Sequence, residues 1–440
     1  MNIQKSTSIK RKYLSFFLIV PLILLMIVGL VTLYSTLILP TGGLGNTEIL
    51  TKQFIFISLG LLLFFLFSYF EISYLKHWQL PLVLYFLTIV LLVVTLLFGP
   101  VIKGVKRWLV IGGTQIQPSE IAKFTVIILT SVIFSFKQKY NEWFLLLISF
   151  LFLLPIVVLI YLQPSGSMMI LTIAIWFLLV FMGLSEPLRN GVIISIILLT
   201  IGSFLLSSIT SNNLWFLLLI PALVIAIFGY NAKRNWKIFI IISLLIGLVI
   251  GIFSTITWRN VLKDYQKERI VAFINPDEIS TDKVFNVNQS KIAIGSGRIF
   301  GKGFGNGTQS KRNFLPEFRT DFIFASYAEE FGLTGSLFLM FLYGFIVVYC
   351  FITALNSKEN TLFSMISIGV GIKLLLEIFI NIGTNTGSIP ATGIPLPLMS
   401  AGGTITVVTF MCLGLVHNIY LRNSQKLRTK KAEIIDIYED

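Results

Sequence analysis

Twelve long apolar runs restrict the fold of this chain more than any other feature of its sequence. A helix needs about 20 apolar residues to cross the roughly 30 Å hydrocarbon core of a bilayer, and the runs are close to that length. They span residues 14–38, 52–71, 80–99, 119–137, 143–162, 167–185, 190–208, 214–231, 236–254, 322–354, 361–383 and 401–422. With 55% hydrophobic and 12% charged residues, the chain has too much apolar surface for a water-soluble fold. We therefore predict an all-α polytopic membrane protein.

The positions of Lys and Arg predict the orientation of these helices. Short connecting segments in the cytoplasm carry an excess of positive residues. Such residues cluster near 5–12, 137–139, 233–237 and 422–431, and twelve crossings place all four clusters on one side. We predict that 1–13 and 423–440 are cytoplasmic tails, the second loosely ordered, and that 14–422 form one transmembrane domain. The segments 100–118, 163–166, 255–321 and 384–400 then face outward.

The net charge of +14 favours a negatively charged partner. We exclude nucleic acid because the sequence has no soluble domain to carry a groove-reading element, and anionic lipid is the better match. Cys350 and Cys412 lie within apolar runs and are interpreted as packing residues. His77 and His417 fall near predicted cytoplasmic ends, which leaves no histidine for catalysis on the outward side.

The first outward segment joins basic and aromatic residues to the start of a helix. Lys106, Arg107 and Trp108 could form a lip that binds an anionic headgroup, or Trp108 could be a simple interfacial anchor. Ser119 is expected to cap the next helix. Lys123 lies about one turn inside the membrane, where Glu120, three residues earlier, is the expected partner for its charge.

The segment 255–321 is far longer than an ordinary connection between helices, which indicates a functional loop. Its glycine-rich part, 295–307, follows Lys291 and contains Lys302, and its backbone amides could hold a phosphate. A loop that lies flat on the bilayer would have a similar composition, so both interpretations stay open.

Asp321 directly precedes the apolar residues Phe322, Ile323 and Phe324. Partial burial at such a helix mouth raises the pKa of a carboxylate toward the range of a general base. The alternative is that Asp321 caps the helix. Glu329 and Glu330 lie deeper and need buried partners or a polar cavity.

The segment from Asn381 to Thr404 is dense in proline and glycine and contains Ser400. Irregular backbone at membrane depth is tolerated only where it is buried in protein or lines a wet cavity. It is therefore either a rigid loop or one wall of a substrate groove. In the preceding helix, Lys373 and Glu377 are four residues apart and can neutralise each other.

These motifs together resemble the SEDS family (shape, elongation, division and sporulation), which comprises cell-wall glycosyltransferases of the RodA, FtsW and SpoVE type. The match spans about residues 14 to 421, and Ile294–Gly297 with Gly307–Gln309 is most similar to the RodA type. The matching motifs are Arg107–Leu109, Gln117–Lys123, Gln289–Gly297, Leu315–Glu317, Thr320–Phe324, Glu329–Glu330 and Pro395–Gly403.

The resemblance implies a peptidoglycan glycosyltransferase in the bacterial cytoplasmic membrane that polymerises lipid II, with the growing lipid-linked glycan as donor. Asp321 is the implied catalytic residue and Trp108 the other position needed for activity. Basic groups or a divalent cation, Mg or Mn, would take up charge on the departing pyrophosphate. The predicted substrate-binding residues are Trp108, Arg107, Lys106, Glu120, Lys123, Lys291, Lys302, Gln309, Glu317 and Ser400.

The implied partners are a class B penicillin-binding transpeptidase and other proteins of cell elongation or division. Two alternatives remain: a flippase for lipid-linked precursors, because transport pathways also use broken helices and intramembrane charges, and a non-catalytic scaffold for a penicillin-binding protein.

Two features of the chain depart from the family pattern, one residue and the number of helices. The family has Gln-Pro-Asp where this chain has Gln163, Pro164 and Ser165, so the carboxylate that accompanies the Glu120 and Lys123 region is missing. We predict that Glu377 replaces it as a counter-charge to Lys123. The family core has ten helices, and the apolar runs in 190–254 add a transmembrane hairpin.

Overall fold

All twelve predicted apolar runs are helices in the computed structural model, which describes residues 15–39, 43–102, 104–209, 216–233, 236–256, 267, 282–311 and 314–439. Within that part of the chain, ten helices are long and apolar enough to cross a membrane, while α4 and α8 have 17 residues each. The elements are α1 (Phe16–Ser35), α2 (Glu48–Tyr69), η1 (Ile72–Lys76), α3 (Gln79–Phe98), β1 (Leu109–Ile111), β2 (Thr114–Ile116), α4 (Pro118–Phe134), α5 (Glu142–Leu162), α6 (Gly166–Gly183), α7 (Pro187–Ile209), α8 (Phe216–Ala232), α9 (Lys237–Ile256), α11 (Asp282–Gly297), α12 (Thr308–Lys311), α13 (Ile323–Leu355), α14 (Thr361–Thr386) and α15 (Gly403–Glu439). The chain has an all-α polytopic membrane fold.

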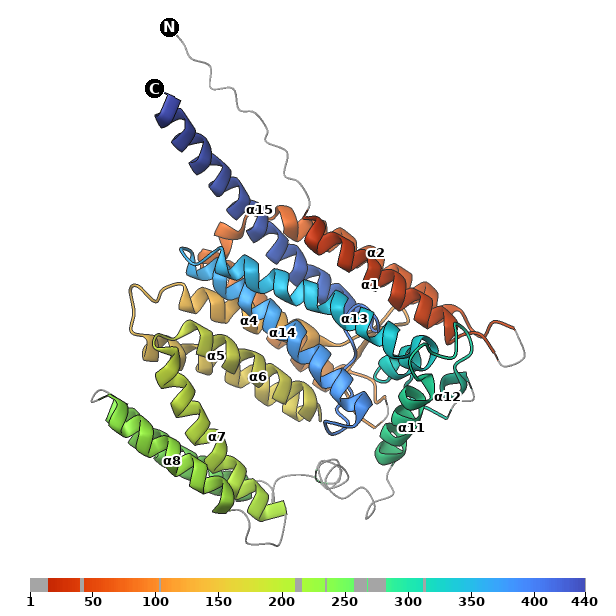
Figure 1. The fold of residues 1–440 in the computed structure, drawn as a ribbon, viewed down its shortest axis with the longest axis horizontal. Helices are drawn as coiled ribbons and strands as arrows, with labels where there is room; N and C mark the ends of the chain where they lie inside the picture. Colours follow the sequence, from red (N-terminus) through yellow and green to blue (C-terminus); the bar gives the residue numbers. More distant parts are fainter. Residues whose placement is uncertain are drawn as a thin grey trace. The chain divides into compact units, whose positions relative to one another are not determined.

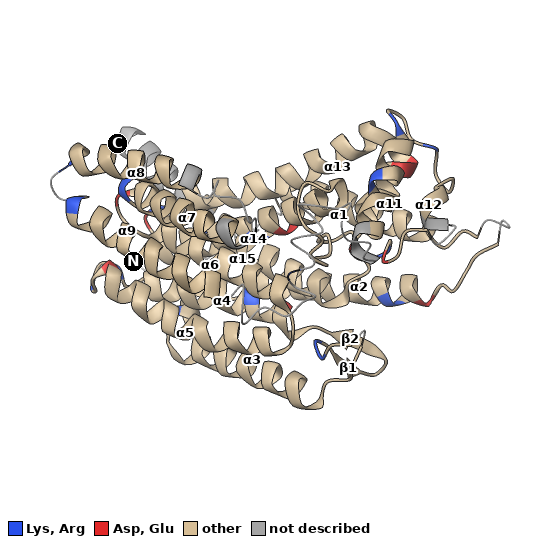
Figure 2. Ribbon diagram, turned by 90° about the horizontal axis from the view of Figure 1, so that it is seen from below, with Lys and Arg blue, Asp and Glu red and all other residues tan. Residues whose placement is uncertain are grey.

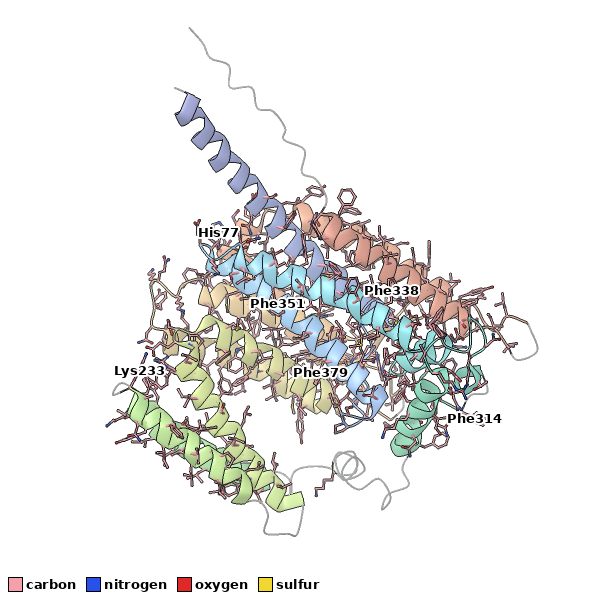
Figure 3. All side chains as sticks on the ribbon, in the orientation of Figure 1. His77, Lys233, Phe314, Phe338, Phe351 and Phe379 are labelled. Carbon is pink, nitrogen blue, oxygen red and sulfur yellow. The ribbon has the colours of Figure 1, made fainter. Side chains whose placement is uncertain are left out.

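The larger of two compact units holds the predicted site. It consists of Met1–Leu179, Gln289–Asn385 and Thr392–Asp440. Within it α15 packs along α2, α1 packs along α13, and α3 packs against α4 and α5, so that segments far apart in sequence lie side by side (Figure 1). Exposed apolar side chains such as Phe338 and Phe379 lie on the outer faces of its helices (Figure 3), as expected where the solvent is lipid.

The smaller unit, Val180–Asn288 with Thr386–Ala391, contains α7, α8 and α9. The three apolar runs predicted within 190–254 are these helices, and α7 packs against both of the others. Side chains of α7 lie directly over glycines of α9, Thr200 over Gly247 and Phe204 over Gly251. Small residues at such positions let membrane helices approach closely.

A β-hairpin that the sequence analysis did not predict lies between Trp108 and α4. β1 pairs antiparallel with β2, and the turn uses Gly112 and Gly113 at φ +57° and +74°, where glycine has no Cβ clash. The N-cap of α4 is Gln117 and Pro118 occupies the first turn. The predicted cap at Ser119 is therefore wrong, because a proline at the first helical position places the cap two residues earlier.

The second predicted tail also differs from expectation. Residues 423–439 continue α15 as a helix, which runs from Gly403 to Glu439, beyond the ends of its neighbours in the larger unit (Figure 1). The prediction of a loosely ordered tail was wrong, because this charged segment is rich in helix-forming Lys, Arg and Glu and extends a helix that is already formed.

α13 is interrupted at Gly332, whose φ of +65° and ψ of −161° are not helical. The glycine-rich loop supplies the hydrogen bonds that this break removes. Lys302 N and Gly303 N donate to the carbonyls of Glu329 and Glu330, each at 3.0 Å. On the far side of the break, Leu333 N donates to Arg298 O at 2.9 Å and Thr334 N donates to Ile299 O at 3.0 Å.

This interlock of residues 298–303 with residues 329–334 depends on glycine. A Cβ atom on Gly301 would overlap Glu330 O, and one on Gly332 would overlap Gly301 N; both residues have positive φ, +81° and +65°. A Cβ atom on Gly297 would likewise overlap Ala328 O. The backbones of loop and helix therefore touch directly, which only glycine permits.

We expect Gly301→Ala and Gly332→Ala each to lower the free energy of unfolding by about 1–3 kcal/mol, because each places a side chain in a left-handed backbone conformation and against backbone atoms. Thermal unfolding in detergent measures this. Gly295→Ala is the matched control, since a Cβ there meets nothing within 4 Å. Equal loss of stability in all three variants would contradict the interlock.

Candidate active site

The predicted outward segments meet on one side of the larger unit. Gln117 N donates to Thr404 Oγ1 at 3.0 Å, and Arg107 donates to the carbonyl of Pro164. Ala401 N donates to Arg319 O at 2.8 Å. The segment 100–118 is thus linked to 163–166 and to the start of α15, and the segment 392–402 is linked to 314–322. In Figure 2 most charged positions lie at helix ends and in the loops between helices.

Asp321 lies in the turn before α13, and its backbone is held by α14. Asn381 Nδ2 and Asn385 Nδ2 both donate to Asp321 O, at 2.9 and 3.0 Å. The N-cap of α13 is Phe322, without a side-chain cap, so the interpretation of Asp321 as the helix cap is wrong. The carboxylate faces the irregular segment, where a Cβ on Gly393 would lie 3.3 Å from Asp321 Oδ2.

Asn385 joins three parts of the site. Its Oδ1 accepts a hydrogen bond from Ala325 N at 3.1 Å, in the first turn of α13. Its carbonyl accepts one from Ser290 Oγ of α11 at 2.8 Å. The sequence analysis did not assign this role to Asn381 or Asn385; the available signal was a pair of amides, four residues apart, at the end of an apolar run.

Ser400 positions the turn and is not available as a ligand for substrate. Its side chain is fully buried, Oγ donates to Thr320 O at 2.6 Å, and Leu396 N donates to Oγ at 2.8 Å. The hydroxyl therefore donates one hydrogen bond and accepts another within the chain. The prediction of substrate binding by Ser400 is therefore corrected to support of the residue that precedes Asp321.

Arg319 is a second residue that the sequence analysis missed. Its guanidinium donates to Thr36 O, at the end of α1, at 3.2 Å and lies over the Phe318 ring at 4.8 Å. Burial lowers the pKa of Arg319, although an arginine remains protonated at neutral pH. A fixed positive charge thus lies two residues from Asp321.

The glycine-rich loop closes around Glu329 of α13. The carboxylate accepts hydrogen bonds from Lys302 Nζ at 2.6 Å, Thr308 Oγ1 at 2.8 Å and Thr308 N at 2.9 Å, and one from Gln309 N at 3.1 Å. Ser35 donates to the neighbouring Glu330. The expectation that both glutamates need buried partners is confirmed. Lys302 is engaged in this ion pair and Gln309 lies beside it.

The other predicted substrate residues lie at the surface. Lys291 on α11 is exposed, while Lys106, Arg107 and Trp108 are half-buried. Glu317 is exposed, has φ +55° and accepts a hydrogen bond from Thr320 Oγ1 at 3.0 Å. These residues are accessible to a ligand, and their contact with substrate stays a prediction.

Glu120 and Lys123 belong to a buried cluster of four charges. Lys123 Nζ lies 2.9 Å from Glu120 and 2.5 Å from Glu377, and Lys373 Nζ lies 2.7 Å from the other oxygen of Glu377. Lys373 also donates to Thr409 Oγ1 of α15 at 3.4 Å. The predicted pairing of Glu377 with Lys123 is confirmed, as is that of Lys373 with Glu377.

The charge cluster, meaning Glu120, Lys123, Lys373 and Glu377, is neutral in sum. All four side chains are at most 1% exposed, so none is accessible to substrate. Direct substrate binding by Glu120 and Lys123 is therefore corrected to a structural role, because charges in a medium of low dielectric constant need opposite charges beside them.

One face of α14 connects the charge cluster with Asp321. Lys373, Glu377, Asn381 and Asn385 follow one another at intervals of four residues, which places neighbours on the same side of a helix. The first two belong to the charge cluster and the last two hold Asp321 O. This polar face of α14 links the interior of the unit to the site.

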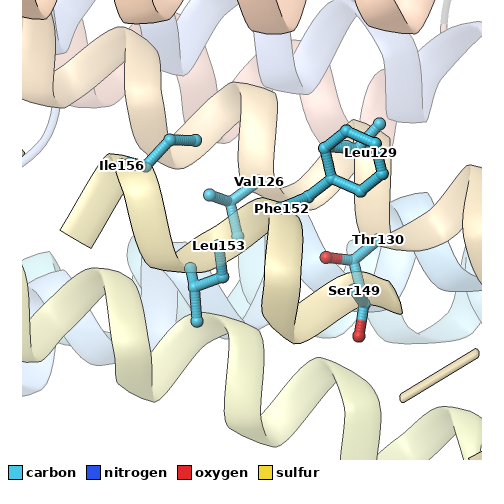
Figure 4. A pocket seen from close by; sticks show the side chains of 7 residues that line it. All are labelled: Val126, Leu129, Thr130, Ser149, Phe152, Leu153 and Ile156. Atoms are coloured by element: carbon cyan, nitrogen blue, oxygen red, sulfur yellow. The ribbon is translucent and has the colours of Figure 1, made fainter. Parts of the chain in front are cut away.

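A small apolar pocket between α4 and α5 lies apart from these residues. Its lining is Val126, Leu129, Thr130, Ser149, Phe152, Leu153 and Ile156 (Figure 4). No predicted site residue contributes to it. The site is instead the surface formed by the linked outward segments.

The fold and the site define a class: a multi-pass membrane protein in which several loop segments meet near an aspartate whose backbone is held by α14. A family model described as cell cycle protein (FtsW/RodA/SpoVE) matches residues 15–215 and 211–425. The chain belongs to this family, which confirms the resemblance read from its motifs.

Relatives with assigned activities cover most of the chain. The peptidoglycan glycosyltransferase MrdB of Escherichia coli K12 is 29% identical over 402 residues, which are 91% of this chain and 93% of MrdB. The peptidoglycan glycosyltransferase RodA of Treponema pallidum is 29% identical over 430 residues, 92% of this chain and 97% of RodA.

Solved structures share the fold. The rod shape determining protein RodA of Thermus thermophilus has a TM-score of 0.57 and 22% identity, with 93% of this chain and 97% of that chain covered. A chain from the structure described as "Structural coordination of polymerization and crosslinking by a peptidoglycan synthase complex" has a TM-score of 0.64 and 23% identity, with 94% and 99% covered.

We expect Glu377→Gln to destabilise the protein by about 3–5 kcal/mol, because it leaves two buried lysines with one carboxylate between them. Glu377→Gln combined with Lys373→Met leaves only the Glu120 and Lys123 pair and should recover most of that loss. Thermal unfolding in detergent compares the two variants. A double variant less stable than the single one would refute the neutral cluster.

Proposed function

We propose that this peptidoglycan glycosyltransferase polymerises lipid II, with Asp321 as the general base that activates the acceptor sugar hydroxyl. The observation that carries the proposal is the support of Asp321: α14 holds its carbonyl, Ser400 holds the residue before it, and its carboxylate faces the irregular segment. A general base must be held within hydrogen-bonding reach of the proton it removes.

In the proposed reaction, Asp321 removes the proton of the acceptor hydroxyl as its oxygen attacks the anomeric carbon of the lipid-linked glycan. The carbon inverts its configuration, and the bond to the undecaprenyl pyrophosphate breaks with both electrons leaving on the phosphate oxygen. Four basic side chains could hold the anionic pyrophosphate in this proposal. They are Arg319, the exposed Lys291, and Lys106 and Arg107 at the lip.

The described residues do not form a binding site for a divalent cation, Mg or Mn, from protein side chains alone. Those residues contain no group of three or more His, Cys, Asp or Glu side chains that could hold a metal.

A class B penicillin-binding transpeptidase is the partner we propose for the outward side, because it would cross-link the glycan as it emerges. A solved chain of the same fold belongs to a structure described as a peptidoglycan synthase complex. We place the chain in the bacterial cytoplasmic membrane with both termini cytoplasmic, as the positive-inside rule indicates.

We expect Asp321→Asn to reduce glycan polymerisation by about 100-fold or more, because it removes the base but keeps the shape of the side chain. Purified protein with lipid II and the transpeptidase gives polymer that is measured on gels. Glu48→Gln, an exposed carboxylate at the start of α2, is the matched control. Unchanged polymerisation by Asp321→Asn would refute the role of Asp321.

The same preparation separates the rival functions. A flippase would translocate lipid II in liposomes equally well with Asp321→Asn, and a scaffold would give no polymer unless its partner polymerised. Polymer made by the chain in the presence of a transpeptidase that cannot itself polymerise would exclude both.

We expect Asn385→Asp to lower kcat by about 10- to 100-fold with little change in KM, because small displacements of a catalytic group are costly. The variant keeps the acceptor for Ala325 N and loses the donor to Asp321 O. Steady-state polymerisation measures this, with the exposed amide Asn356→Asp as control. A change in KM alone would show that Asn385 acts on binding.

A further inference from the structure

The turn at Ile299 and Phe300 presents two large apolar side chains outside the protein. Phe300 is 81% exposed, the highest value among large hydrophobic residues of the described chain, and Ile299 is 57% exposed. An isolated exposed hydrophobic residue needs no explanation, but two adjacent ones at this level in a rigid turn indicate a surface that something covers.

The interlock holds this turn rigidly against α13. Arg298 O and Ile299 O accept hydrogen bonds from Leu333 N and Thr334 N, and Gly301 N lies in contact with Gly332. The backbone of the turn is therefore adjacent to the first residues of α13 after the break.

Those first residues begin the lipid-facing stripe of α13. Exposed apolar residues recur along one side of the helix at intervals of four and seven, as they do on helices in lipid. The stripe comprises Leu333 (54% exposed), Leu337 (56%), Phe341 (61%), Val348 (53%) and Ile352 (50%). Ile299 and Phe300 thus adjoin the outward end of a surface covered by acyl chains.

The length of α13 sets the depth of the turn. At 1.5 Å per residue, the part from Leu333 to Leu355 is just long enough to cross a hydrocarbon core of roughly 30 Å. Leu333 then lies at the boundary between acyl chains and headgroups, and so does the turn that is bonded to it. Arg298, exposed and next to the turn, can reach lipid phosphates at that depth.

We propose that Ile299 and Phe300 insert into the outer leaflet of the bilayer and anchor the glycine-rich loop at the acyl–headgroup boundary. Phospholipid is the occupant because the turn continues a surface that already faces lipid, and because apolar side chains beside a basic residue match that boundary. The anchor sets the height of the half-helix 323–331, and with it Asp321, relative to the membrane. This inference does not depend on the proposed reaction.

Site-specific fluorescence tests the anchor directly. Cys350 and Cys412 are fully buried, so Phe300→Cys in the full-length protein can be labelled selectively with an NBD dye and reconstituted in liposomes of phosphatidylglycerol and phosphatidylethanolamine. Asn306→Cys, an exposed polar residue of the same loop, is the matched control. Ile299→Cys gives a second probe if Phe300→Cys does not fold.

An inserted turn gives blue-shifted NBD emission at 300 and 299, and at least about twofold quenching by lipids that carry nitroxides near the headgroup, with neither effect at 306. Emission typical of water and no quenching at both 300 and 299 would overturn the proposal. It would also be overturned if the two positions became shielded only when the transpeptidase was added, which would assign the turn to a protein partner.

Discussion

Electrostatic neutrality in the interior of the larger unit is the constraint on which the rest of this structure depends. Four buried side chains, Glu120, Lys123, Lys373 and Glu377, carry two charges of each sign. Each would be costly alone at low dielectric constant, and removal of any one leaves a charge unpaired. The charge cluster therefore fixes α4 and α14 relative to each other, with a further hydrogen bond to α15 through Thr409.

α14 connects the charge cluster to the site and supports it. The helix face that begins with Lys373 and Glu377 ends with Asn381 and Asn385, which hold the backbone of Asp321. On the other side, the interlock at Gly332 ties the half-helix that follows Asp321 to the glycine-rich loop. The backbone of Asp321 is thus supported from both sides, and in the proposed reaction this support would hold the base in place.

Sequence reasoning succeeded where the physics is local or the choice of partners is small. Apolar runs located every membrane helix, because hydrocarbon leaves the backbone few alternatives. Glu377 was correctly paired with Lys123, because a buried cation needs an anion and Ser165 cannot supply one. The cap at Ser119 failed for an equally local reason, since Pro118 starts the helix earlier.

What the sequence determined by itself was the class of fold and the family, which follow from hydrophobic length and from motifs in fixed order. Apart from the ion pairs of Lys123 with Glu120 and Glu377 and of Lys373 with Glu377, only the tertiary structure decided which polar residues touch which. Ser400, Glu120 and Lys123 were expected to bind substrate, yet they are buried. Ser400 and Lys123 lie against partners far away in sequence, and Glu120 lies against Lys123. The hydrogen bonds of Asn385 and the backbone contact of Gly332 also join distant segments. Such contacts depend on packing, which the local sequence pattern does not encode.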